Sequence, residues 1–68
     1  MSSHDRAQLD AVLESLIDQY DLARIIESLA RVCFEKGEHI RSNWQDEPLA
    51  EAWESDGQTL LDISWKVA

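Results

Sequence analysis

Two rows of carboxylates are the most prominent chemical feature of this 68-residue sequence. Within each row the side chains are three or four positions apart, which places them on one face of a helix. Like charges at this spacing slightly disfavour a helix, so a basic partner or a need for solubility would explain them. The first row is Asp10, Glu14 and Asp18, and the second is Glu47, Glu51 and Glu54.

Such rows could imitate nucleic-acid phosphates and block a protein that binds them. One row offers a charge about every 6 Å of helix axis. Two rows side by side reach one charge per ~3 Å, which is sparser than the one per ~1.7 Å of duplex DNA. A solvated acidic surface is therefore the more common explanation, and a phage-type mimic that inhibits a nucleic-acid-binding protein is the alternative.

The residue types that usually carry catalysis or bind metal are not suitably combined. Glu35 and His39 have i,i+4 spacing, but carboxylate-bridged metal bundles need matching Glu-His pairs on other helices. Cys33 lies among apolar positions and resembles a small core residue, whereas a nucleophilic thiol is partly exposed and flanked by positive charge. No Gly-rich phosphate loop is present. We expect no enzyme activity, no catalytic residue, no metal and no cofactor.

Three tryptophans are many for so short a chain. Trp53 shares a helical face with other apolar residues and is expected in the core. Trp65 falls outside that face if its segment is helical, and exposed tryptophan is enriched at binding hot spots. Together with Trp44, Trp65 and the two carboxylate rows form the candidate partner-binding set.

The net charge of −8 excludes several classes of partner. Nucleic-acid binding needs clustered Lys and Arg, and an anionic membrane surface attracts basic segments. No apolar run approaches the ~20 residues that span a bilayer, and the start of the sequence lacks the pattern of a secretory signal. These features predict a cytoplasmic protein with a protein partner, which could be basic, and no direct contact with nucleic acid or membrane.

Helical periodicity extends over most of the chain. It predicts an all-α single domain over residues 1–68, a small three-helix bundle with helices at about 5–20, 22–42 and 47–66. Asp21 and Asp46 are the expected N-caps of the later helices, and Pro48 suits a first helical turn. The apolar arc of the second helix covers roughly 200°, too wide for one neighbour, so this helix is expected to be the central one. Gly37 lies in that arc, where another backbone could approach closely.

Two features of the third segment leave alternatives open. Ser55-Asp56-Gly57 resembles a helix end, and beyond it apolar and polar residues alternate with the period of a strand. The last ten residues could therefore be extended, although a helix is preferred. Lys36 and Asp56 project into apolar faces and could form an ion pair between helices.

A chain of this length buries only ~60% of its unfolded surface, and homodimerisation would enlarge its core. We therefore expect a small acidic protein–protein interaction or regulatory module that forms a homodimer.

Overall fold

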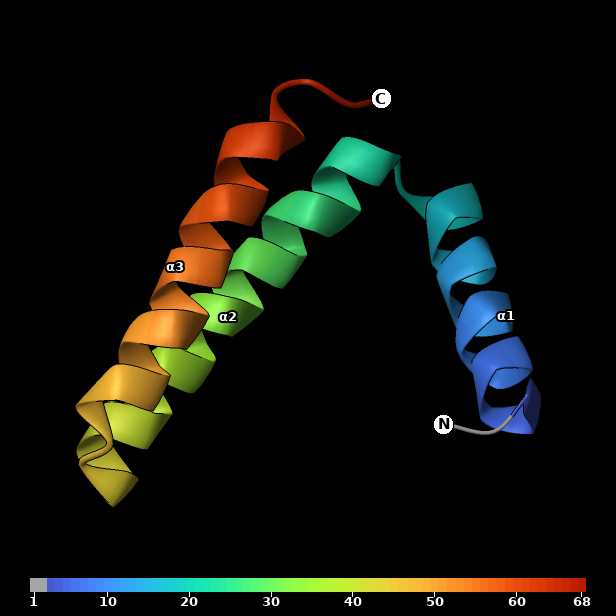
Figure 1. Ribbon diagram of the computed structural model, residues 1–68. Helices are drawn as coiled ribbons and strands as arrows, with labels where there is room; N and C mark the ends of the chain where they lie inside the picture. The colour runs from blue at the N-terminus through green and yellow to red at the C-terminus, as the bar shows by residue number, and fades with distance from the viewer. Residues whose placement is uncertain (1–2) are drawn as a thin grey trace.

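The computed structural model describes residues 3–68 and contains three helices, α1 (Ser3–Gln19), α2 (Leu22–Trp44) and α3 (Glu47–Ser64) (Figure 1). No strand occurs among the described residues. The all-α fold with three helices and α2 in the middle is therefore confirmed. The observed ends differ from the predicted ones by about two residues: α2 continues to Trp44, and α3 stops at Ser64.

Both predicted N-caps are present. The backbone of Asp21 is extended, and its Oδ1 accepts a hydrogen bond from the Arg24 N–H at 2.8 Å. Asp46 Oδ1 accepts from the Leu49 N–H at 3.1 Å. Each carboxylate thus satisfies one of the N–H groups that a helix start leaves without an internal partner.

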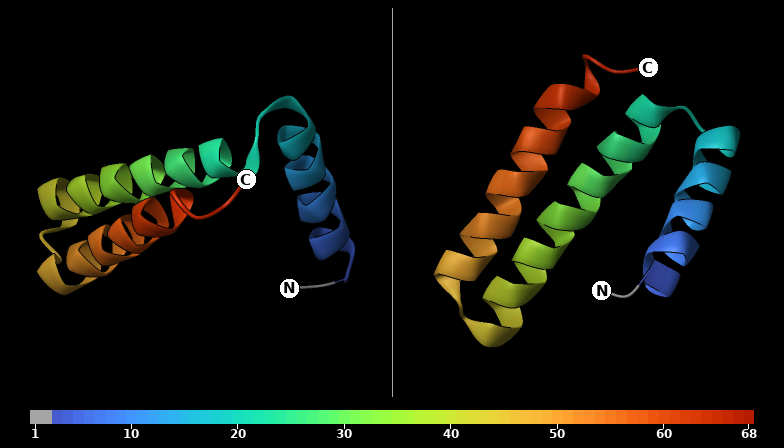
Figure 2. Two further views of the ribbon diagram at one scale, coloured as in Figure 1. Left: turned by 90° about the horizontal axis from the view of Figure 1, so that it is seen from above. Right: turned by 45° about the vertical axis from the view of Figure 1, so that its right-hand side comes forward.

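Helices α2 and α3 form an antiparallel hairpin, in which the two axes remain side by side along their length (Figure 2). The contact is made by small side chains: the most buried residues are Ala30, Cys33 and Gly37 on α2, and Ala50 and Gly57 on α3. A Cβ on Gly57 would lie 3.0 Å from the Ala30 carbonyl oxygen. The close approach expected at Gly37 is present too, and it lets the two backbones nearly touch.

The alternative of an extended last segment is wrong. Gly57 lies inside α3, and no described glycine has a positive φ, so it does not end the helix. Its role is to pack against α2. The Lys36–Asp56 ion pair is also absent, since both residues are exposed and the ion pairs of residues 3–68 do not include them.

The last four residues turn back across the start of α2. Trp65 is in the right-handed helical region, and the Lys66 N–H donates to the Ile63 carbonyl oxygen at 2.9 Å. The Ala68 carbonyl oxygen then accepts a hydrogen bond from the Ala23 N–H. This return covers Val67 partly but leaves Trp65 outside.

Helix α1 diverges from the hairpin and contacts α2 only near the corner formed by Tyr20 and Asp21 (Figures 1 and 2). Across residues 3–68 it makes no contact with α3. The radius of gyration is 14.0 Å, whereas a compact chain of this length has about 11 Å. Of the two sides of α2 expected to be covered, α3 covers one, and α1 covers the other only at its end.

Candidate functional site

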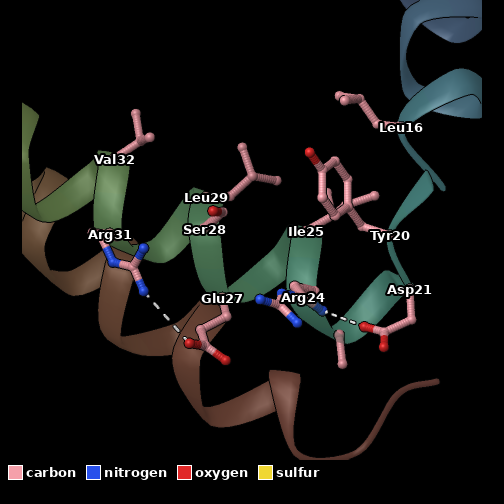
Figure 3. A pocket seen from close by; sticks show the side chains of 11 residues that line it. Leu16, Tyr20, Asp21, Arg24, Ile25, Glu27, Ser28, Leu29, Arg31 and Val32 are labelled. Atoms are coloured by element: carbon pink, nitrogen blue, oxygen red, sulfur yellow. Dashed lines mark hydrogen bonds and ion pairs between the residues drawn. The ribbon is translucent and has the colours of Figure 1, made fainter.

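An open groove lies between the end of α1 and the first half of α2 and encloses about 850 Å³. We call it the α1–α2 groove. Its α2 wall is an apolar row, Ile25, Leu29 and Val32, which we call the open face of α2. Figure 3 shows these side chains on one side of the helix, with Leu16 and Tyr20 of the corner beside them. Leu29 and Val32 keep 44% and 46% of their surface exposed, so this row is not core.

The apolar stripe of α1 reaches the groove at the end of the helix, where Leu16 and Tyr20 line it. We call this stripe the apolar face of α1. Leu9, Val12, Leu13, Ile17 and Tyr20 are exposed, and Val12 retains 57% of its surface. Leu16 is half-buried. A helix in a folded protein normally buries such a stripe against another element, because each large apolar side chain stabilises by ~1.5–3 kcal/mol when buried.

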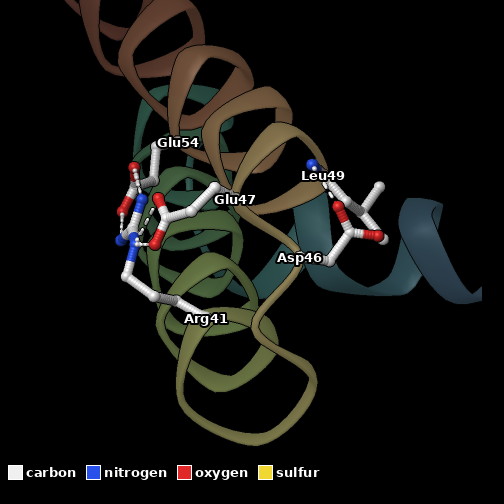
Figure 4. A network of polar contacts seen from close by, with 5 residues as sticks. All are labelled: Arg41, Asp46, Glu47, Leu49 and Glu54. Carbon is white, nitrogen blue, oxygen red and sulfur yellow. Dashed lines mark hydrogen bonds and ion pairs between the residues drawn. The ribbon is translucent and has the colours of Figure 1, made fainter.

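Two members of the second carboxylate row are held by an arginine of α2 (Figure 4). Nη1 and Nη2 of Arg41 donate to the two carboxylate oxygens of Glu54 at 2.6 and 2.9 Å. Nε donates to both oxygens of Glu47 at 3.0 Å. The hydrogen bonds that Arg41 donates to Glu54 lower the pKa of Glu54. Donation to Glu54, and next to Glu47, raises the pKa of Arg41. Within residues 3–68, Glu51 is the member of this row without an ion pair.

The first carboxylate row remains free to meet a partner. Asp10, Glu14 and Asp18 are exposed along α1, and none of the ion pairs found in residues 3–68 includes them. Successive helical residues are rotated by ~100°, which places this row on a different side of α1 from the apolar face. Since α1 and α3 do not touch, the two carboxylate rows form no common surface.

The two candidate tryptophans are exposed but far apart. Trp44 retains 73% and Trp65 84% of its surface. Trp44 ends α2 at the turn, whereas Trp65 follows the far end of α3, so the 18 residues of α3, about 27 Å of helix, lie between them. They cannot belong to one small contact site. Trp53 is half-buried in the hairpin.

Sequence reasoning missed the α1–α2 groove. Its signal was the width of the apolar arc of α2, which indicated two neighbours but not that one of them is missing within the chain. In the part of the chain that is described, no three His, Cys, Asp or Glu side chains are grouped closely enough to hold a metal ion.

No protein-family model matches this chain, and neither curated proteins nor solved structures compared with it show a significant similarity. None of the helices in the described residues combines the length and the apolar character that crossing a bilayer requires.

Proposed function

We propose that this protein is a small protein–protein interaction module whose docking surface is the α1–α2 groove together with the apolar face of α1. The observation that carries the proposal is the exposure of large apolar side chains on the α2 wall of the groove and along the α1 helix that leads into it. An amphipathic helix is the class of partner that suits this surface, because such a helix presents apolar anchors at i, i+3, i+4 and i+7 to an apolar groove.

The size of the exposed surface supports this role. A compact protein of 7.8 kDa exposes about 4,400 Å², whereas this chain exposes 5391 Å². The difference of about 1,000 Å² is comparable to the ~800 Å² that each partner buries in an interface of standard size. The chain therefore has enough accessible surface for one specific interface.

The alternative, an acidic mimic of nucleic acid, has less support. Arg41 already occupies Glu47 and Glu54, which reduces the charge that the second row can offer to a basic partner. The first row alone has one carboxylate per ~6 Å of axis. This row could face a basic partner, but the spacing of its carboxylates does not reproduce the spacing of phosphates in a duplex.

A capture experiment with matched variants tests the proposal. The wild-type chain, Val12→Glu, Leu29→Glu and the control Ala11→Glu would be immobilised and exposed to a native-host lysate at low and moderate salt. Ala11 is exposed on the opposite side of α1, so its substitution adds the same charge away from the apolar face.

The proposed docking surface predicts a protein retained by wild type and Ala11→Glu in moderate salt and lost by both other variants. Equal capture by all four chains would contradict it. A partner lost from every chain in moderate salt would support the acidic alternative, because charged contacts at a surface are screened.

A further inference from the structure

The identity of the helix that fills the α1–α2 groove can be inferred from the chain itself. We propose that it is α1 of a second copy of this chain, so that two chains exchange their first helices and each apolar face of α1 covers the open face of the other α2. This inference rests on the proposed function and names the partner of the same surface.

The first argument is self-complementarity. One chain carries both an unfilled apolar groove on α2 and an uncovered amphipathic helix, α1. In a two-fold dimer the same patch meets itself, so a groove and its filler on one chain satisfy both halves of the contact at once. The surplus of about 1,000 Å² per chain matches the ~800 Å² that each member of a stable dimer buries.

The second argument is the corner between α1 and α2. Only Tyr20 and Asp21 connect the helices, and Asp21 is fixed by its cap hydrogen bond to the Arg24 N–H. For α1 to cover its own α2, the backbone of these two residues would have to change. The α1 helix of another copy has no such constraint.

The third argument is charge. Helix α1 carries four carboxylates, and Arg6 is its single Lys or Arg residue. Arg24 and Arg31 line the groove, along with Asp21 and Glu27, and Glu27 pairs with Arg31 at 3.5 Å. The charged part of this wall is therefore balanced, two guanidinium groups against two carboxylates, so it does not repel an acidic helix.

Sedimentation equilibrium of the full chain tests the assembly. The wild type and Ala11→Glu are expected at twice the 7.8 kDa chain mass at tens of micromolar. Val12→Glu and Leu29→Glu are expected at the monomer mass, with the helical circular dichroism of the α2–α3 hairpin retained. A wild-type monomer up to about 1 mM, or a species larger than a dimer, would overturn the exchange.

A cross-linking experiment tests the geometry without depending on weakened variants. Two chains would be made in a Cys33→Ala background, one with Leu13→Cys and the other with Leu29→Cys. Mixing them with a flexible bis-maleimide should give a covalent dimer that contains one of each chain. A chain with both cysteines that cross-links only within itself would show α1 folded onto its own α2 and would overturn the inference.

The two proposals fail separately. If the isolated chain is monomeric but captures another protein through Val12 and Leu29, the second copy is not the occupant and the proposed function stands. If the chain dimerises and Val12→Glu has no more effect than Ala11→Glu, the dimer uses another surface and the exchange is overturned, while the capture experiment still decides the proposed function.

Discussion

The side chain of Glu54 on α3 passes over the surface of α2 at Gly37, where the glycine has no side chain to block it. A Cβ on Gly37 would lie 2.9 Å from Cγ of Glu54 and 3.0 Å from the carbonyl oxygen of Ala50. Because the glycine leaves this space, the Glu54 carboxylate reaches Arg41, one helical turn further along α2. Close backbone packing and the ion pair therefore depend on the same residue.

Replacing Gly37 with alanine should destabilise the hairpin. Alanine improves helix propensity by ~1 kcal/mol, but the added methyl group meets backbone and the base of the Glu54 side chain, and overpacking of this kind typically costs ~1–3 kcal/mol. We expect a net loss of roughly 1 kcal/mol in urea unfolding followed by circular dichroism.

Ser42→Ala is the control for Gly37→Ala, because Ser42 is an exposed residue of α2. It should leave stability unchanged or slightly higher. A Gly37→Ala chain more stable than wild type would mean that the helices do not approach closely at this position.

The stabilisation by Glu54 should depend on pH. Its pKa in the folded protein is below the ordinary value of 4.5, chiefly because Arg41 donates hydrogen bonds to the carboxylate. A lowered folded pKa contributes stability that is present above the unfolded value and is lost as the pH falls through the folded value. The difference in unfolding free energy between wild type and Glu54→Gln should thus be constant above about pH 5.5 and shrink below about pH 4.5.

Glu51→Gln is the matched control for this titration, since Glu51 is in the same row and has no ion pair in the described residues. The Glu54 effect should be modest, because both charged side chains keep 34% of their surface exposed and solvent screens them. A wild-type advantage over Glu54→Gln that grows on acidification would contradict the assignment.

The helices could be predicted from the sequence because their signals are local. Apolar residues recur with helical spacing, and Asp21 and Asp46 are followed by helix formers, so the elements and their starts follow from neighbouring residues. Gly37 in an apolar arc likewise indicated a close approach. These signals need no knowledge of how one helix is placed against another.

The candidate site was harder to predict, since it depends on the relative placement of helices. The contact between Arg41 and Glu54 spans 13 residues and exists only in one register of the hairpin. Periodicity shows that α1 and α2 each have an apolar face, but it does not show whether the two faces pack against each other. The angle at Tyr20 and Asp21 decides that, and no glycine or proline marks this corner.

Removing the N-cap of α2 should loosen the corner that forms one end of the groove. Asp21→Ala eliminates the hydrogen bond to the Arg24 N–H and should cost about 1 kcal/mol, whereas Asp21→Asn keeps an accepting oxygen and should cost little. Chemical unfolding of the two variants compares them directly. Equal losses for alanine and asparagine would show that the side-chain oxygen does not cap the helix.

The three tryptophans should respond differently to a neutral quencher such as acrylamide, which the net charge of −8 does not repel. Trp65 and Trp44 are mostly exposed, and Trp53 is half-buried against α2. Trp65→Phe should therefore reduce the quenchable fluorescence, and the double variant Trp44→Phe/Trp65→Phe should leave a bluer, weakly quenched emission from Trp53. Because Trp65 lies outside the α1–α2 groove, formation of the proposed dimer should leave this pattern unchanged. Strong protection of Trp65 that appears only on association would place the contact at the end of α3 instead of in the groove.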